Sequence, residues 1–274
     1  METEKRLGII GVGNMGESLL KGWLKAGLTE PELIRVFDLS SERRKMARQQ
    51  YGVQIATDNL DLVRTAEILL LAVKPQGLAQ VLAEIRPEVK KSHLVISIAA
   101  GIPISFLEEF LPTARIIRVM PNTPTMVQAG MAALAPGSRA TADDLQLALK
   151  LFQAVGEAVV VEEKHLDAVT GLSGSGPAYV LVFLEALADG GVKMGLTRET
   201  ALLLAGQTLL GAAQLVLQSQ RHPAQLKDSV TSPGGTTIAG LHVLEQGAFR
   251  GLVMSAVEAA TRRAQELGQT ALNP

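Results

Sequence analysis

The sequence contains no cysteine, and this absence removes several kinds of chemistry at once. Without cysteine, disulfide bonds, thiolate metal sites and cysteine nucleophiles are excluded. The histidines do not take over this role. His222 and His242 stand far apart in the sequence, and neither has an acidic partner at the spacing of a metal site. We therefore expect no metal.

Charge is also scarce. Only 19% of the 274 residues are charged, the formal net charge is −1, and no basic run is longer than ERRK. Nucleic-acid binding depends on concentrated lysine and arginine, so we expect no nucleic-acid partner. The 47% hydrophobic content predicts instead a globular protein with a large core.

One segment, residues 200–220, has no charge at all and is long enough to be tested as a membrane span. Four polar side chains interrupt its apolar run: Gln207, Thr208, Gln214 and Gln218. Side-chain amides are costly in hydrocarbon. We expect no membrane span but a helix that is covered on every side, in part by another subunit. The start, METEKRLGII, is charged and does not resemble a signal peptide, so a cytoplasmic location is expected.

Residues 1–161 alternate short apolar runs with helical stretches. The runs RLGIIG, LIRVFD, EILLLAV and HLVISIAAG are continuously apolar, which is typical of parallel strands buried on both faces. MGESLLKGWLKAG and SSERRKMARQQYG have helical spacing and end at Gly27 and Gly52. RIIRVMPNTP and GMAALAPG predict two more strands. The pattern predicts an α/β domain with a Rossmann-type, doubly wound sheet and right-handed crossovers.

After Val161 every segment has the pattern of a helix, interrupted by Gly-Gly, RHP and SPGG. The sequence therefore predicts two domains, a dinucleotide-binding domain at 1–161 and an all-helical domain at 162–274.

A dinucleotide fingerprint follows the first predicted strand directly. Gly11-x-Gly13-x-x-Gly16 has glycines where a tight turn, the approach of a pyrophosphate and helix–strand packing require them. The fingerprint stands between a strand and a helix, which makes it far more specific than the spacing alone. The expected coenzyme contacts are Gly11, Val12, Gly13, Asn14, Met15 and Gly16.

The choice between NADH and NADPH stays open. Asp38 ends the next strand, where a carboxylate favours the free ribose hydroxyls of NADH and repels a 2′-phosphate. Ser40, Ser41, Arg43 and Arg44 follow within one turn and would suit that phosphate, although the arginines equally fit a solvated helix face. From the sequence, Asp38→Ser is expected to raise the use of NADPH relative to NADH.

Three further turns follow predicted strands at the edge where such sheets bind ligands. They are Ala72–Pro75, Ser97–Gly101 and Met120–Pro124. Small residues in the first two permit close approach of a coenzyme. The third holds Asn122 between two prolines, and we place it near the nicotinamide.

The helical half lacks the base that hydroxyacid oxidation needs. Gly171-x-x-Gly174-x-Gly176 is similar to the pattern of β-hydroxyacid dehydrogenases, in which a lysine and an asparagine follow at intervals of four residues. Val180 and Leu184 stand at those positions here. An alcohol oxidation needs a group that takes the hydroxyl proton, so this class of reaction is disfavoured.

The segment SVTSPGGTTIAGLHVLE, residues 229–245, predicts an anion site without a strong acid or base. A Gly-Gly-Thr-Thr turn that opens a helix directs N–H groups and hydroxyls outward, which suits a carboxylate or a phosphate. An imine that arrives already protonated needs only a hydrogen-bonding hydroxyl. The site therefore fits a cyclic imine that carries a carboxylate.

Together, IGVGNMGESL, AVKP, SIAAG, VMPNTP, TGLSGSGPAYV, EALADGGVKMGL and QLKDSVTSPGGTTIAGLHVLE resemble the pyrroline-5-carboxylate reductase family, from about Leu7 to Leu267. The resemblance implies that NADPH or NADH reduces 1-pyrroline-5-carboxylate to L-proline. It also implies that the helical domain binds the substrate and forms an interlocked homodimer, which often assembles into a decamer.

The resemblance also implies roles for individual residues. The substrate carboxylate would be held by Ser232, Gly234, Gly235, Thr236 and Thr237, and the Thr237 hydroxyl would lie nearest the ring nitrogen as the proton donor. Asn59 would meet the adenosine ribose, and Val73, Lys74 and Ala99 would line the coenzyme. Glu163 and Ser229 match positions near the substrate and the nicotinamide. Two alternatives stay open: a reductase of another small imine or carbonyl acid, and a non-catalytic dinucleotide sensor.

Overall fold

The computed structural model describes residues 4–272, and only the backbone of 270–272. The chain forms two compact units, Met1–Ser175 with Glu258–Pro274 (unit 1) and Gly176–Val257 (unit 2). The units divide at 175/176 rather than at the predicted 161/162. The reason is that Leu166 is fully buried in a cluster with Ile104, Ala133 and Ala135, so the segment after 161 packs onto the sheet of unit 1.

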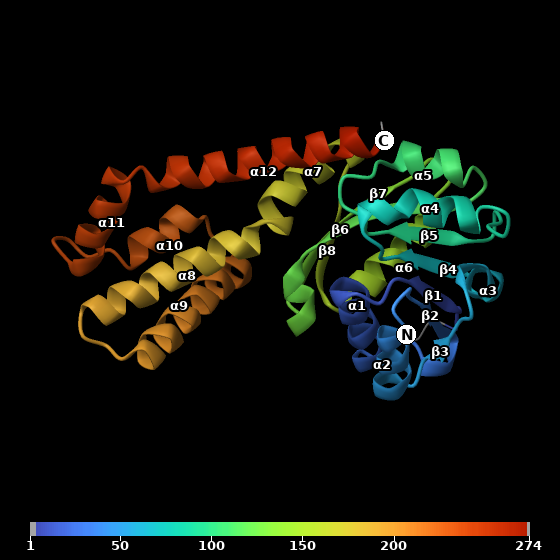
Figure 1. Ribbon diagram of the computed structural model, residues 1–274. Helices are drawn as coiled ribbons and strands as arrows, with labels where there is room; N and C mark the ends of the chain where they lie inside the picture. Colours follow the sequence, from blue (N-terminus) through green and yellow to red (C-terminus); the bar gives the residue numbers. More distant parts are fainter. Residues whose placement is uncertain (1–3, 273–274) are drawn as a thin grey trace. The chain divides into compact units, whose positions relative to one another are not determined.

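Unit 1 is built on one eight-stranded sheet (Figure 1). The strand order is β3-β2-β1-β4-β5-β6-β7-β8. All neighbours are parallel except β6 and β7. The strands are β1 (Leu7–Ile10), β2 (Ile34–Phe37), β3 (Gln54–Ile55), β4 (Ile68–Leu71), β5 (Leu94–Ser97), β6 (Arg115–Pro121), β7 (Gly130–Pro136) and β8 (Gly156–Val160).

Continuous apolar runs form the central strands because both faces of the sheet are covered. In β4, Ile68 and Leu70 enter one hydrophobic cluster, while Leu69 and Leu71 enter the other. The first cluster includes residues of α1 (Asn14–Lys25), α2 (Ser41–Tyr51) and α6 (Ala142–Gln153). The second includes residues of α3 (Asn59–Thr65), α4 (Pro75–Ile85) and α5 (Ile104–Phe110).

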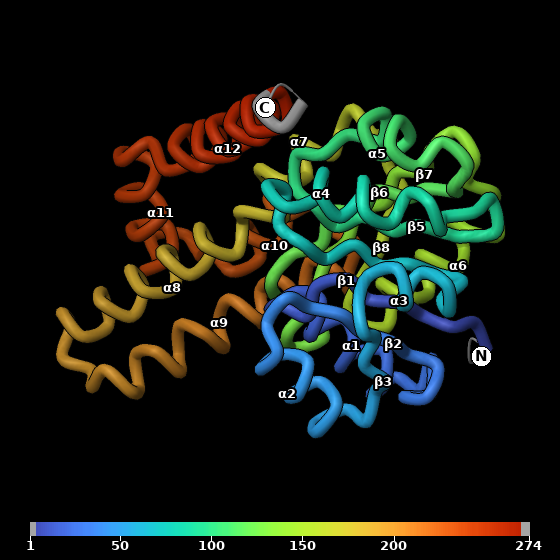
Figure 2. Tube along the Cα trace, turned by 45° about the vertical axis from the view of Figure 1, so that its right-hand side comes forward, coloured from blue at the N-terminus to red at the C-terminus, as the bar shows by residue number. Residues whose placement is uncertain are grey.

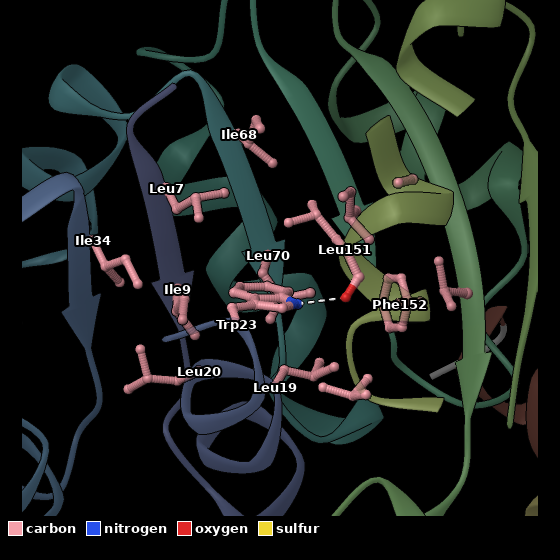
Figure 3. Packing of buried hydrophobic residues seen from close by; sticks show 14 of the residues in the cluster. Leu7, Ile9, Leu19, Leu20, Trp23, Ile34, Ile68, Leu70, Leu151 and Phe152 are labelled. Atoms are coloured by element: carbon pink, nitrogen blue, oxygen red, sulfur yellow. Dashed lines mark hydrogen bonds between the residues drawn. The ribbon is translucent and has the colours of Figure 1, made fainter. Parts of the chain in front are cut away.

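Trp23 is the largest side chain of the first cluster and connects two helices (Figure 3). Its indole Nε1 donates a hydrogen bond of 2.7 Å to the Leu151 carbonyl of α6, so the one polar atom of the buried ring is satisfied. Figure 3 shows Leu19, Leu20 and Phe152 in the same cluster. This packing fixes α1, and with it the turn from β1 into α1, against the sheet.

The topology positions a binding edge. From β1 the chain continues to β2 on one side, and later to β4 on the other, so the strand order reverses at β1. Ligands of doubly wound sheets bind at the carboxyl ends of the strands at such a reversal. The fingerprint turn and the turns after β2, β4, β5 and β6 all lie at this edge, because these strands are parallel.

Unit 2 consists of helices with a small internal core. Its elements are α8 (Gly176–Lys193), α9 (Arg198–Ser219), α10 (Pro223–Ser229), α11 (Thr236–Gln246) and the first part of α12 (Phe249–Leu272). Helices α8 and α9 lie side by side (Figures 1 and 2) and bury Ala188, Ala201 and Ala205. Most of the exposed large apolar side chains among the described residues belong to this unit. Glu163–Lys193 and Arg198–Ser219 are long and apolar enough to cross a membrane, judged by length and composition alone.

The later part of α12 belongs to unit 1. Ala264 is buried there, and a Cβ on Gly268 would lie 2.7 Å from the Gly101 carbonyl oxygen. The helix backbone therefore touches the turn after β5, and only glycine permits this approach. Three shorter pieces connect β8 to α8: η3 (Glu163–His165), α7 (Leu166–Val169) and a π-helical turn at Thr170–Gly174.

Candidate active site

The fingerprint turn has the geometry that its glycines predict. Gly11 has φ +95°, a conformation that side chains strain, and its N–H donates to the Phe37 carbonyl at 2.8 Å. A Cβ on Gly16 would lie 2.2 Å from the Gly11 oxygen, so α1 packs directly on the turn. Gly13 is the N-cap of α1, and no side chain caps the helix. The N–H groups of the first helical residues, which include Asn14 and Met15, are therefore not used by a capping side chain and suit a ligand anion.

A hydrogen bond fixes α2 beside this turn. The Tyr51 hydroxyl donates to Glu17 Oε1 at 2.8 Å, and Glu17 stands in the first turn of α1. Burial of the phenol, and then the hydrogen bond and charge of Glu17, raise the pKa of Tyr51 to about 12. This hydrogen bond joins α1 to α2, and the Tyr51 hydroxyl keeps its proton at neutral pH.

Asp38 is only 9% exposed, and the turns around it use its carboxylate. Oδ2 accepts the Val12 N–H at 2.8 Å, and Oδ1 accepts the Ser40 N–H at 2.9 Å. The Ser40 hydroxyl in turn caps α2 by accepting from the Arg43 N–H. Asp38 therefore connects the fingerprint turn to the turn after β2.

The turns after β4 and β5 lie at the same edge. The Ala72 N–H continues the sheet by donating to the Ile10 carbonyl at 2.9 Å. Val73 follows, Lys74 is the N-cap of α4, and Pro75 is its first residue. Ala99 follows β5 and is buried.

Asn59 carries an unpaired polar atom. The residue begins α3 and is 4% exposed. Its Nδ2 donates to Glu84 Oε2 at 2.8 Å, while Oδ1 is buried without a hydrogen-bond partner. A buried acceptor without a partner is costly, so this atom is suited to a ligand hydroxyl.

Asn122 is tied to the protein on both sides of its amide. Oδ1 accepts the Met131 N–H at 2.8 Å, and Nδ2 donates to the carbonyl and hydroxyl oxygens of Ser173, both at 3.2 Å. This corner holds the end of β6 against β7 and the π-helical turn. A contact with the nicotinamide stays a prediction.

The carboxylate of Glu163 is directed at groups of unit 1. Its Oε1 accepts from the Ile104 N–H at 2.6 Å and from Arg118 Nη1 at 3.1 Å. Arg118 is buried and also lies 3.7 Å from Asp167. These bonds give Glu163 a role in joining α5 to β6, and its predicted contact with substrate stays a prediction.

The Gly-Gly-Thr-Thr turn opens α11 in unit 2. Gly234 has φ +67°, and the Gly235 N–H donates to the Ser232 carbonyl at 3.1 Å. Gly235 is the N-cap and provides no side-chain cap, so the N–H groups at the start of α11, which begins with Thr236 and Thr237, are not used by a capping side chain. The hydroxyl of Ser229 instead donates to the Leu226 carbonyl within its own helix.

A pocket of about 570 Å³ lies along α11, within unit 2. Gly234 and Gly235 line it together with Lys227 and His242. We did not predict the last two from the sequence. The sequence does hold a signal for His242. It stands four residues after Ile238, which stands four residues after Gly234, and this spacing places His242 on the face of α11 that follows the glycines.

Among residues 4–272, no group of three or more histidine, aspartate and glutamate side chains is arranged to hold a metal ion.

The predicted coenzyme contacts of unit 1 lie together at one edge of the sheet. The predicted carboxylate contacts at 232–237 form one turn of unit 2.

Known proteins match both units. A family model described as pyrroline-5-carboxylate reductase dimerisation matches residues 163–267, and one described as NADP oxidoreductase coenzyme F420-dependent matches residues 6–101. The pyrroline-5-carboxylate reductase of Methanosarcina acetivorans is 48% identical over 270 residues, which are 98% of this chain and 100% of that protein. The chain belongs to the pyrroline-5-carboxylate reductase family.

Other members of the family agree in sequence and in structure. The pyrroline-5-carboxylate reductase of Synechocystis is 49% identical over 264 residues, 96% of this chain and 98% of that protein. The crystal structure of the Plasmodium falciparum pyrroline carboxylate reductase with NADP bound has a TM-score of 0.89 at 35% identity, covering 98% of this chain and 100% of that one. The reductase of Coxiella burnetii has a TM-score of 0.91 at 38% identity, with coverage of 97% and 99%.

Proposed function

We propose that this chain catalyses the last step of proline biosynthesis, the reduction of 1-pyrroline-5-carboxylate to L-proline by NADPH or NADH. The observation that carries the proposal is the match to reductases of this name, at 42–49% identity over almost the entire chain. In the reaction, a hydride adds to the imine carbon and the protonated ring nitrogen becomes an amine.

The edge of unit 1 fits the dinucleotide. The N-terminus of α1 lacks a side-chain cap and suits a pyrophosphate. Apart from the chain neighbours of Gly13, the nearest atom to a Cβ built on that residue is Arg43 Nη1, at 3.6 Å. Asn59 Oδ1 is buried without a hydrogen-bond donor, and a ribose hydroxyl would supply one. When bound, NAD(P)H supplies the hydride. The protein itself holds the turns after β1, β2, β4 and β5 in place.

The start of α11 is our proposed site for the substrate carboxylate. The N–H groups at the beginning of the helix carry no side-chain cap, and the helix dipole favours an anion there. The hydroxyls of Ser232 and Thr236 would add donors. The Thr237 hydroxyl would hydrogen-bond the ring nitrogen and is the proposed catalytic group. Because the imine nitrogen arrives protonated, its N–H would donate to the Thr237 hydroxyl oxygen, and hydride addition then needs no strong acid.

The chain acts as a homo-oligomer, and we propose that the dimer is formed by the helical unit. Its exposed apolar side chains give a reason, since contiguous apolar surface marks an interaction site. A second copy of the chain, rather than a membrane, is the proposed cover for α8 and α9. Assembly of dimers into a decamer and a cytoplasmic location are further proposals, which rest on the resemblance to the family.

The test is steady-state kinetics with 1-pyrroline-5-carboxylate and each coenzyme, followed by the loss of nicotinamide absorbance. Thr237→Ala should lower kcat about a hundredfold, the size of effect that follows from losing one hydrogen bond at the reacting group. Thr237→Ser keeps the hydroxyl and should retain most of the activity. Coenzyme affinity, measured by calorimetry, should be unchanged in both variants.

The outcomes separate the reaction from the role of Thr237. Near-normal turnover by Thr237→Ala would refute that role while leaving the reaction in place. Coenzyme binding by the wild type without turnover would instead favour a dinucleotide sensor or a reductase of another imine.

A further inference from the structure

Three charged side chains lie in the turn after β2 and in the first turn of α2, where each could distinguish NADPH from NADH. They are Asp38, Arg43 and Arg44, and they differ in how far the protein already uses them. The distinction depends on the 2′-phosphate of the adenosine ribose, which lies near the end of this strand in a fold of this kind.

Asp38 is committed to the protein. Both of its carboxylate oxygens accept backbone N–H groups, from Val12 at 2.8 Å and from Ser40 at 2.9 Å. Two donors compensate its charge, and its low exposure leaves little of the carboxylate open to a ligand. The expected repulsion of a 2′-phosphate is therefore weakened. Asp38 instead fixes the fingerprint turn, which either coenzyme needs.

Arg44 is also committed. Its guanidinium donates to the backbone carbonyls of Asp38 and Leu39, and it lies over the ring of Phe37, 5.2 Å from the centroid. Carbonyl acceptors and an aromatic face stabilise the cation where it is. To reach a phosphate, Arg44 would have to give up these contacts.

Arg43 is the arginine that is free to respond. Its side chain is 53% exposed, and its only charged contact among the described residues is Asp38 Oδ2 at 3.7 Å, which is too long for a hydrogen bond. A Cβ built on Gly13 would lie 3.6 Å from its Nη1. The guanidinium therefore lies beside the second glycine of the fingerprint, and its forked donors match a phosphate.

We propose that Arg43 selects for NADPH by binding the 2′-phosphate, and that Asp38 is a positioning residue that serves both coenzymes equally. The inference rests on the proposed function, because it assumes a nicotinamide dinucleotide at this edge. It reverses the expectation from the sequence, in which Asp38 selects against NADPH.

The experiment compares full-length Arg43→Gln and Asp38→Asn with Arg48→Gln, a control on the exposed surface of the same helix. Calorimetry gives the dissociation constants of NADPH and NADH, and of the fragments 2′,5′-ADP and 5′-AMP. Arg43→Gln should weaken NADPH and 2′,5′-ADP by about tenfold to a hundredfold, the usual value of charge-assisted hydrogen bonds. It should leave NADH and 5′-AMP unchanged, and Arg48→Gln should change none of the four.

Asp38→Asn should weaken NADPH and NADH by the same factor, because asparagine cannot accept both N–H groups through its two side-chain atoms. Each variant is judged by the ratio of two coenzymes on one preparation, so a partial loss of folded protein does not affect the result. The proposal is overturned if Asp38→Asn raises the preference for NADPH, or if Arg43→Gln weakens both coenzymes alike. A wild type that binds both but does not reduce 1-pyrroline-5-carboxylate would refute the proposed function only.

Discussion

His93 is buried in the turn before β5, where its Nδ1 accepts the Lys90 N–H at 2.8 Å. Burial, and then the nearby charges of Lys90 and Arg115, lower the pKa of the imidazole below 6.5. In the unfolded chain the same ring titrates near its ordinary value. Above that value both states are neutral and His93 contributes its full stabilisation. As the pH falls, the unfolded state takes up the proton first, so stability is lost.

We therefore expect His93→Asn to reduce the loss of stability on acidification. The asparagine Oδ1 can accept the Lys90 N–H, but it does not titrate. Urea midpoints measured between about pH 7.5 and pH 5 should fall more steeply for the wild type than for the variant. Carboxylates contribute equally to both proteins and cancel in the comparison. Equal slopes would show that His93 is not protonated on unfolding in this range.

The role of a single residue can be predicted from the sequence where the backbone conformation permits only one residue type. Gly11 and Gly16 are examples, because the turn and the helix contact exclude every side chain there. The sequence does not predict the hydrogen bonds of Asp38 and Glu163, because their partners are distant along the chain. The contact of Asp38 with the adenosine ribose stays a prediction from its position at the end of a strand. Its bond to the Val12 N–H could be known only from the fold.

Among the elements, the long helices and the central strands follow from their apolar spacing and their glycine ends. The two-residue β3, the edge strand β8 and the π-helical turn at Thr170–Gly174 were not predicted, because each takes its structure from neighbouring elements. The strand β7 was predicted without its direction. Its antiparallel pairing with β6 has a simple cause: the connection at 122–129 is too short for the crossover that parallel strands require.

The contact between α12 and the turn after β5 gives a prediction at this scale. A Cβ on Gly268 would meet the backbone oxygen of Gly101, which cannot turn aside as a side chain would. Gly268→Ala should therefore destabilise the protein by about 1–3 kcal/mol, although alanine is the better helix former. Gly77→Ala in α4 is the control, since no atom beyond its chain neighbours and its own helix backbone lies within 4 Å of a Cβ there. It should be neutral or stabilise by up to about 1 kcal/mol.

Thermal and urea unfolding of the two glycine variants would measure this difference. A Gly268→Ala protein as stable as Gly77→Ala would mean that the end of α12 does not press on the turn.

For the whole molecule, the contrast between the two units predicts how stability depends on assembly. Unit 1 has two large hydrophobic clusters, whereas the described core cluster of unit 2 contains three buried alanines. A helical unit with so little internal core depends on apolar cover from another copy of the chain. The family model for dimerisation matches this part of the sequence.

Leu203→Asp tests this dependence. Leu203 lies on α9 and is 72% exposed within one chain. A carboxylate buried without a partner in the dimer should cost about 3–5 kcal/mol. We expect the variant to elute as a monomer and to melt at a lower temperature, as measured by light scattering after gel filtration and by calorimetry. Gln50→Glu, on the exposed end of α2, adds the same charge and should leave both properties unchanged. A dimeric Leu203→Asp protein would place the interface elsewhere.

The division of unit 1 into Met1–Ser175 and Glu258–Pro274 has a consequence for synthesis on the ribosome. The sheet is translated early, but the segment that packs on Gly101 emerges only after all of unit 2. During this interval the nascent coenzyme edge lacks the backbone contact that Gly268 later supplies. Closing unit 1 is therefore a long-range step, and it couples maturation of the coenzyme edge to translation of the helical unit.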